Sequence, residues 1–197
     1  NVTASRSKIL INNRPVFMRG NLDCLHFPLT GYPSCDIQEW ERIFRIYKSY
    51  GLNHVRFHSW CPPEAAFTAA DRIGIYIQAE VLWIDWWMSV VRKERPEMTT
   101  RGLPKGLGHN PSADKFVPEE LQRMIEAYGN HPSFTMLCIG NELGNSNFDI
   151  MQQWIKSLQE KDPRRLYAIS TARKIMPADQ YMVTHNIPQT GGTYGIN

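Results

Sequence analysis

The chain has 197 residues, of which 42% are hydrophobic and 21% are charged, and its formal net charge is +3. These values are typical of a globular domain with one sizeable core and exclude a disordered or low-complexity chain. Lys and Arg are scattered, so we expect no nucleic-acid partner, and no apolar stretch approaches the roughly 20 residues that a membrane helix requires.

The first half of the chain alternates between predicted strands and helices. Asp36 and Glu39 form a capping-box pattern at the start of a helix, and Gly51 marks its end. Pro62 and Pro63 open a second helix, which Gly74 closes. The predicted strands around these helices are residues 15–20, 52–57 and 75–81.

The second half continues the alternation after a segment rich in Gly, Pro and Trp. This segment, residues 83–115, is an insertion of the kind that more often serves function than connection alone. A helix is then predicted from Pro118 to Gly129, and another over residues 148–159, with its apolar positions at helical spacing. The remaining predicted strands are residues 134–140, 166–170 and 181–184.

Strands that alternate with helices predict a parallel sheet, either doubly wound or closed into a barrel. Residues 19–23 show neither a dinucleotide fingerprint nor a phosphate-binding loop after the first strand, which favours the barrel. A complete barrel takes about 250 residues, whereas this chain shows about six strands. We therefore expect residues 1–197 to form a single α/β domain, an incomplete (β/α)8 TIM barrel truncated at its C-terminus. Its open sheet edges favour self-association.

The cysteines carry no sign of a metal or redox function. Cys24, Cys35, Cys61 and Cys138 lack the spacing of metal ligands, and Cys138 lies inside an apolar strand, where a thiol acts as a small hydrophobic group. We expect unpaired structural thiols and neither a metal nor a cofactor. The first residues show no signal peptide, and the compartment stays open.

Polar side chains gather at the predicted carboxyl ends of the strands, where parallel barrels keep their chemistry. The apolar strand before Gly140 leads directly into Asn141 and Glu142, which makes Glu142 the leading catalytic candidate. Carboxylates that move protons, polar groups that bind hydroxyls and tryptophans that stack on sugar rings suit a carbohydrate substrate. The other residues at the strand ends are Asp23, Arg56, His58, Glu80, Asp85, His185 and Asn186, with Trp60, Trp83, Trp86 and Trp87 nearby.

Several of these residues also have plainer explanations. Arg56 could be a structural ion-pair partner of Glu80, and His58 alone is more often a core histidine than a ligand. The tryptophans could pack under a loop or at a subunit contact. A metal-dependent barrel hydrolase is a further alternative, although the chain has no HExxH pair and no His-x-His pair.

Five stretches resemble the catalytic barrel of the glycoside hydrolase family 2 enzymes, the β-galactosidase, β-glucuronidase and β-mannosidase group of clan A. They cover most of the first three-quarters of the chain, and the Gly-Asn-Glu sequence at the end of the fourth strand is the most specific. The family's histidine falls three residues after the arginine of the second strand, whereas Ser59 stands there and His58 comes one residue earlier. The five stretches are residues 11–20, 50–56 and 70–76, Glu80, and residues 140–142.

The resemblance implies a retaining glycosidase in which Glu142 is the general acid/base and Asn141 binds the hydroxyl next to the anomeric carbon. It also implies that Arg56 orients the site and that a nucleophilic glutamate ends the seventh strand. After Glu160 the sequence has no glutamate, so we expect the nucleophile beyond this chain and the chain alone to be inactive. The alternative function is a non-catalytic carbohydrate-binding barrel. Glycan degradation favours a periplasmic or secreted location.

Overall fold

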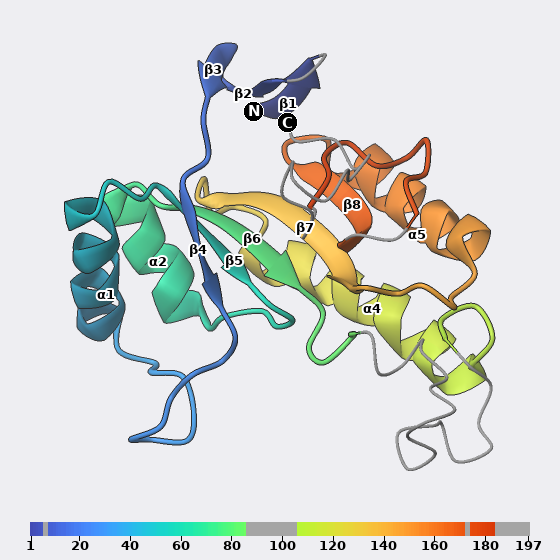
Figure 1. Cartoon of the computed structure of the whole chain (residues 1–197), viewed down its shortest axis with the longest axis horizontal. Helices are drawn as coiled ribbons and strands as arrows, with labels where there is room; N and C mark the ends of the chain where they lie inside the picture. Colours follow the sequence, from blue (N-terminus) through green and yellow to red (C-terminus); the bar gives the residue numbers. More distant parts are fainter. Residues whose placement is uncertain (6–7, 86–105, 172–173, 184–197) are drawn as a thin grey trace, which may run out of the picture.

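The computed structural model describes residues 1–5, 8–85, 106–171 and 174–183 (Figure 1). Its centre is a parallel sheet of five strands in the order β4-β5-β6-β7-β8, so each strand lies beside its neighbours in sequence. A parallel sheet with this order and a helix between each pair of successive strands is part of a β/α barrel. The strands are β4 (Gly20–Asp23), β5 (His54–Phe57), β6 (Tyr76–Glu80), β7 (Phe134–Asn141) and β8 (Leu166–Thr171).

Helices cover one face of this sheet (Figure 1). Strand alternation places Val55, Ile77 and Leu137 on that face, where they join the larger hydrophobic cluster with side chains of the helices. The opposite face, the barrel interior, carries a second cluster that includes Met136 and Ala168. The helices are α1 (Ile37–Ser49), α2 (Glu64–Ile73), α4 (Pro111–Tyr128) and α5 (Phe148–Lys161).

The ends of α1 and α2 follow the predicted capping signals. Asp36 is the N-cap of α1, and its side chain accepts a hydrogen bond from the backbone N–H of Gln38. Glu39, the other half of the predicted capping box, instead pairs with Arg42. Helix α2 ends at Gly74, whose φ of 78° is left-handed, a conformation that glycine adopts without steric cost.

A small antiparallel sheet precedes the barrel, and here the predicted first strand, residues 15–20, was wrong. Strands β1 (Val2–Ser5), β2 (Lys8–Ile11) and β3 (Arg14–Val16) form this sheet, and the first barrel strand, β4, begins at Gly20. The cause is the turn at Asn12 and Asn13, whose φ values of 50° and 63° are those of a tight hairpin turn. This turn was not predicted from the sequence.

The small sheet lies at the amino ends of the barrel strands, opposite the strand arrowheads (Figure 1). The backbone N–H of Val2 donates to the carbonyl of Arg164, just before β8, over 2.9 Å. Val2 also packs with Met136 and Leu166 in the interior cluster. The sheet therefore covers the end of the barrel away from the predicted site.

Two other boundaries differ from the prediction. Helix α4 begins at Pro111, not Pro118, because Asn110 caps it with a hydrogen bond to the N–H of Ala113 and a proline is tolerated in the first turn. Pro118 lies inside the helix. The predicted strand at 181–184 is not formed in its described part, residues 181–183, so the described residues give the parallel sheet five strands and not the six predicted.

Where that sixth strand was expected, a turn satisfies the free edge of β8. The side chains of Asp179 and Gln180 accept hydrogen bonds from the N–H groups of Ile169 and Tyr167, at 2.7 Å and 3.0 Å. The N–H of Gln180 donates in turn to the carbonyl of Tyr167. Two N–H groups and one carbonyl that a neighbouring strand would bind are thus already occupied, the N–H groups by side chains and the carbonyl by a backbone N–H.

Candidate active site

A buried hydrogen-bond network joins the carboxyl ends of three strands. Arg56 on β5 donates from Nε to Oε1 of Glu80 on β6 over 2.6 Å, and from Nη2 to Oδ1 of Asn141 on β7 over 3.0 Å. All three side chains are at least nine-tenths buried. These three residues lie together, as predicted, and the guanidinium of Arg56 links the other two.

Glu80 has no exposed surface, and both of its oxygens are taken. Besides Arg56, the amide of Gln78 and the hydroxyl of Ser59 donate to it, at 3.1 Å and 2.9 Å. Burial alone would raise the pKa of Glu80, but the charge of Arg56 and the hydrogen bonds that Arg56 and Ser59 donate lower it below its usual range. Glu80 is therefore ionised and supports Arg56. The substrate contact predicted for Glu80 stays a prediction.

His58, Ser59 and Asp85 continue the network on the other side. His58 Nδ1 lies 2.9 Å from the hydroxyl of Ser59, which donates to Glu80, so Nδ1 carries the proton of this contact. Nε2 lies 3.8 Å from Oδ2 of Asp85, while Oδ1 of Asp85 accepts from Nδ2 of Asn141 over 2.8 Å. The imidazole is partly exposed, as a substrate contact requires.

Glu142 directly follows β7 and is half-buried. Its N–H donates to the carbonyl of Thr171, at the end of β8, over 2.9 Å, and its φ is 53°. The residue before it, Asn141, is the one that Arg56 and Asp85 hold. The backbone at Glu142 is thus fixed on both sides.

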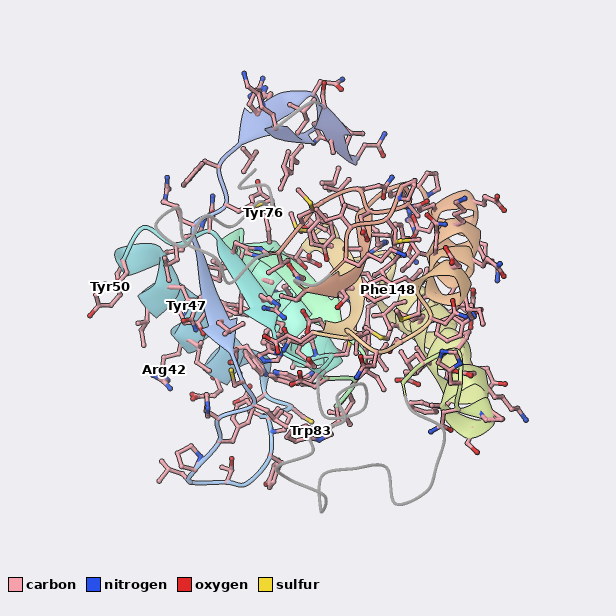
Figure 2. The ribbon with its side chains drawn as sticks, turned by 45° about the vertical axis from the view of Figure 1, so that its right-hand side comes forward. Arg42, Tyr47, Tyr50, Tyr76, Trp83 and Phe148 are labelled. Atoms are coloured by element: carbon pink, nitrogen blue, oxygen red, sulfur yellow. The ribbon has the colours of Figure 1, made fainter. Side chains whose placement is uncertain are left out.

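Three other candidates have different surroundings. The carboxylate of Asp23, at the end of β4, accepts from the N–H of Leu25 and so closes a turn; burial raises its pKa. Trp83 is 57% exposed and lies beyond the end of the sheet (Figure 2). Trp60 is 2% exposed and packs against Phe57 with ring centroids 4.8 Å apart, so it is core and not a sugar platform.

The remaining predicted residues lie outside the described part of the chain. These are His185, Asn186, Trp86 and Trp87. Two members of the network, Gln78 and Ser59, were missed. Gln78 lies two residues before Glu80 and therefore shares its face of the strand, which the sequence did reveal. Ser59 stands at the position of the family's histidine, but its hydrogen bond to Glu80 was not predicted.

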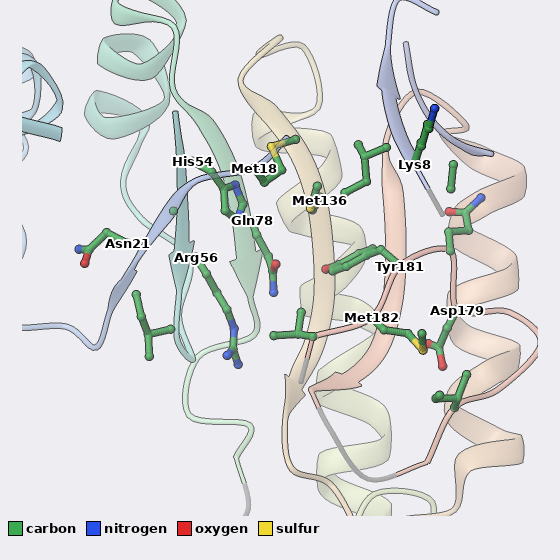
Figure 3. Close-up of a pocket in the computed structure, with 17 residues that line it drawn as sticks. Lys8, Met18, Asn21, His54, Arg56, Gln78, Met136, Asp179, Tyr181 and Met182 are labelled. Atoms are coloured by element: carbon green, nitrogen blue, oxygen red, sulfur yellow. The ribbon is translucent and has the colours of Figure 1, made fainter. Parts of the chain in front are cut away.

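A cavity of about 750 Å³ opens on the interior face of the sheet (Figure 3). Arg56 and Gln78 project into it from β5 and β6, and Tyr181 lies across it near β7. Glu142 does not line it. This space is the barrel interior, which side chains from all strands fill in a closed barrel, and the strand-end network borders it through Arg56 and Gln78.

Neither a metal site nor a membrane segment emerges from the described residues. Among them, no three His, Cys, Asp or Glu side chains are grouped as metal ligands. All four cysteines are free thiols, as predicted, and Cys138 is buried in the interior cluster. None of the described helices combines the length and the apolarity needed to cross a bilayer.

The parallel sheet, its helices and the polar network at the strand ends define a TIM-barrel domain. Residues 2–185 match the family described as glycosyl hydrolases family 2, TIM barrel domain. The chain belongs to glycoside hydrolase family 2.

Solved structures share this fold. A β-glucuronidase of Parabacteroides merdae superposes with a TM-score of 0.65 at 19% identity, over 86% of this chain and 20% of that one. A family 2 member from Bacteroides cellulosilyticus gives 0.65 at 21%, over 90% and 22%. A β-galacturonidase from Eisenbergiella tayi, bound to galacturonate, gives 0.68 at 19%, over 87% and 28%. The chain thus spans less than a third of the length of each.

Proposed function

We propose that this chain carries the acid/base part of a retaining glycoside hydrolase site, with Glu142 as the general acid/base. The observation that carries the proposal is the 3.0 Å hydrogen bond from Arg56 to Asn141, which holds the residue before Glu142 against a buried cation at the strand ends. Membership of family 2 supports the same activity.

Each side chain of the network has a role in this proposal. Glu142 protonates the glycosidic oxygen as the bond to the leaving group breaks, and then deprotonates the water that releases the sugar. Asn141 donates to the hydroxyl next to the anomeric carbon, Arg56 orients Asn141, and Glu80 holds Arg56. The proposed sugar contacts are His58, Asp23, Trp83, His185 and Asn186.

The nucleophile is assigned to a part of the protein outside this chain. Retaining enzymes place their two carboxyl groups about 5–5.5 Å apart. Near Asn141, Glu80 is enclosed by three donors, and Asp85 accepts from Asn141 itself. On this proposal residues 1–197 are one truncated barrel domain and are inactive alone. Robust hydrolysis of aryl glycosides by the isolated chain would contradict that assignment.

The proposed substrate is an O-glycoside. The Eisenbergiella tayi neighbour is described as a galacturonidase, and a Bacteroides uniformis β-glucuronidase is described as covalently bound to a cyclophellitol-6-carboxylate aziridine. Aryl uronides therefore head the panel of test substrates, followed by galactosides and mannosides. The free edge of β4 is the proposed site of any self-association, since β8 is covered by Asp179 and Gln180.

The test uses a protein that contains this chain and compares two leaving groups. Glu142→Ala should lower kcat/KM, which reports the steps up to cleavage of the glycosidic bond, by about 10²- to 10⁴-fold for an alkyl or simple phenyl glycoside. A dinitrophenyl glycoside, whose leaving group needs no proton, should lose far less. Glu160→Ala, at an exposed position of α5, is the matched control. Equal losses with both leaving groups would refute general acid catalysis by Glu142.

A second candidate, a carbohydrate-binding barrel without catalysis, is favoured by the exposed indole of Trp83. The same variant separates the two functions. If the protein hydrolyses nothing and Glu142→Ala binds glycans as tightly as the wild type, the binding function holds.

A further inference from the structure

The segment after β6 crosses the carboxyl end of β7 in close contact with it. The backbone N–H of Asn141 donates to the carbonyl of Ile84 over 2.9 Å. A Cβ atom at Gly140 would lie 2.0 Å from that carbonyl oxygen, so this approach requires glycine. Backbone contact alone therefore brings the next residue, Asp85, to the side chain of Asn141.

The amide of Asn141 has one possible orientation between its two partners. Arg56 can only donate, so the atom 3.0 Å from its Nη2 must be the amide oxygen. An ionised Asp85 can only accept, so the atom 2.8 Å from its Oδ1 must be the amide nitrogen. The chemistry of the partners assigns the oxygen and the nitrogen of the amide.

The charges on either side reinforce this orientation. Asn141 is 3% exposed, and the side chains of Arg56 and Asp85 are 9% and 14% exposed, so solvent screens little of their field. The amide dipole has its oxygen toward the cation and its nitrogen toward the anion. The hydrogen bond to Asp85 uses one of the two N–H bonds of Nδ2.

We propose that Asp85 is a positioning residue of the glycosidase site, which acts through Asn141. It fixes the amide so that the second N–H of Nδ2 is held ready for the substrate hydroxyl next to the anomeric carbon. This inference rests on the proposed function, in which Asn141 makes that contact. Asp85 itself does not touch the reacting atoms.

The first arm of the test needs no activity. In the ¹⁵N-labelled chain, the side-chain NH₂ signals of Asn141 are assigned by their loss in Asn141→Asp. Asp85→Ala should shift these signals and speed their exchange with solvent, whereas Asp149→Ala, an exposed aspartate on α5, should not. The amide of Asn53, which donates to the carbonyl of Phe17, is the internal reference. Unchanged Asn141 signals in Asp85→Ala would overturn the proposal.

The second arm measures kcat/KM in a protein that contains this chain. Asp85→Ala should lower kcat/KM about 10- to 100-fold for an aryl glycoside, the loss expected when a contact group is misplaced. The 2-deoxy analogue, which lacks the hydroxyl, should lose less than about threefold, because Asn141 has nothing there to bind. Asp85→Asn, which still offers an acceptor oxygen, should recover part of the loss.

The outcomes separate a positioning role from a structural one. Equal losses on the glycoside and on its 2-deoxy analogue would mean that Asp85 only holds the segment in place, and would overturn the proposal. If Asp85→Ala shows the Asn141 shift but the wild-type protein hydrolyses no glycoside, the proposed function is refuted, and with it the role of Asp85 in the reaction, while the contact itself stands.

Discussion

Arg56 and Glu80 form an ion pair of 2.6 Å whose side chains are 9% and 0% exposed. Arg42 and Glu39 form one of the same length on α1, but their side chains are 59% and 41% exposed. The two pairs differ in burial and not in distance. This difference decides what each contributes to stability.

Removing the buried carboxylate of Glu80 should strongly lower the free energy of unfolding. Glu80→Ala leaves the guanidinium of Arg56 buried without its counter-charge, which should cost about 3–5 kcal/mol in the free energy of unfolding. The measurement is urea denaturation followed by circular dichroism. Glu39→Ala, the matched control, should have little effect. Similar values for both variants would show that burial of the Arg56 pair has no energetic consequence.

A methyl group at the end of β7 should disturb both folding and the site. In Gly140→Ala the new Cβ would meet the carbonyl oxygen of Ile84 at 2.0 Å, and the crossing segment would have to move. We expect a loss of about 1–3 kcal/mol in stability, the usual cost of overpacking. The Asn141 side-chain signals should also shift as they do in Asp85→Ala. If Gly140→Ala has wild-type stability and unshifted Asn141 signals, the close approach of the Ile84 carbonyl to Gly140 is refuted.

Stability should fall between pH 6.5 and pH 4 because of His54. Burial, aided by the charge of Arg56, lowers the pKa of this imidazole from 6.5 to about 4, against the raising effect of its bond to the carbonyl of Tyr76. In that interval His54 is protonated in the unfolded chain but not in the folded protein, so lowering the pH favours unfolding.

His54→Asn keeps a donor for the carbonyl of Tyr76 and removes the titration. Urea unfolding at several pH values should show a shallower loss of stability for this variant than for the wild type. His109→Asn, at an exposed position, should retain the wild-type slope. Parallel curves for His54→Asn and the wild type would refute the assignment.

Trp83 should affect substrate binding and not the chemical step. Its indole is exposed beyond the strand ends, so Trp83→Ala should raise KM about two- to tenfold, the value of one aromatic contact, with kcat nearly unchanged. Tyr50→Ala is the control, since Tyr50 is 79% exposed at the end of α1, away from the site (Figure 2). A fall in kcat alone would assign Trp83 a different role.

The sequence predicted those features that depend on local pattern. Apolar runs located β5, β6, β7 and β8, capping residues located the ends of α1 and α2, and the rule that parallel strands place polar groups at their carboxyl ends brought Arg56, Glu80 and Asn141 together. These signals arise from alternation and from helix termini, and both are local in the chain.

Features that depend on contacts distant in sequence were not predictable. The burial of Trp60 follows from its ring contacts with Phe27 and Trp40. The place of Asp85 follows from the approach of Ile84 to Gly140, across 56 residues of chain, which no periodicity encodes. The turn at Asn12 and Asn13 was a local signal, and a search for two-residue hairpin turns would have found it.

The hydrogen bonds from β8 to Asp179 and Gln180 make the two edges of the described sheet unequal in their ability to pair with an added strand. A strand that pairs with β8 must first displace the side chains of Asp179 and Gln180, which already bind its N–H groups. At the edge of β4, the described residues include no side chains bound in this way. Another chain that extends this sheet is therefore expected to pair with β4 and not with β8.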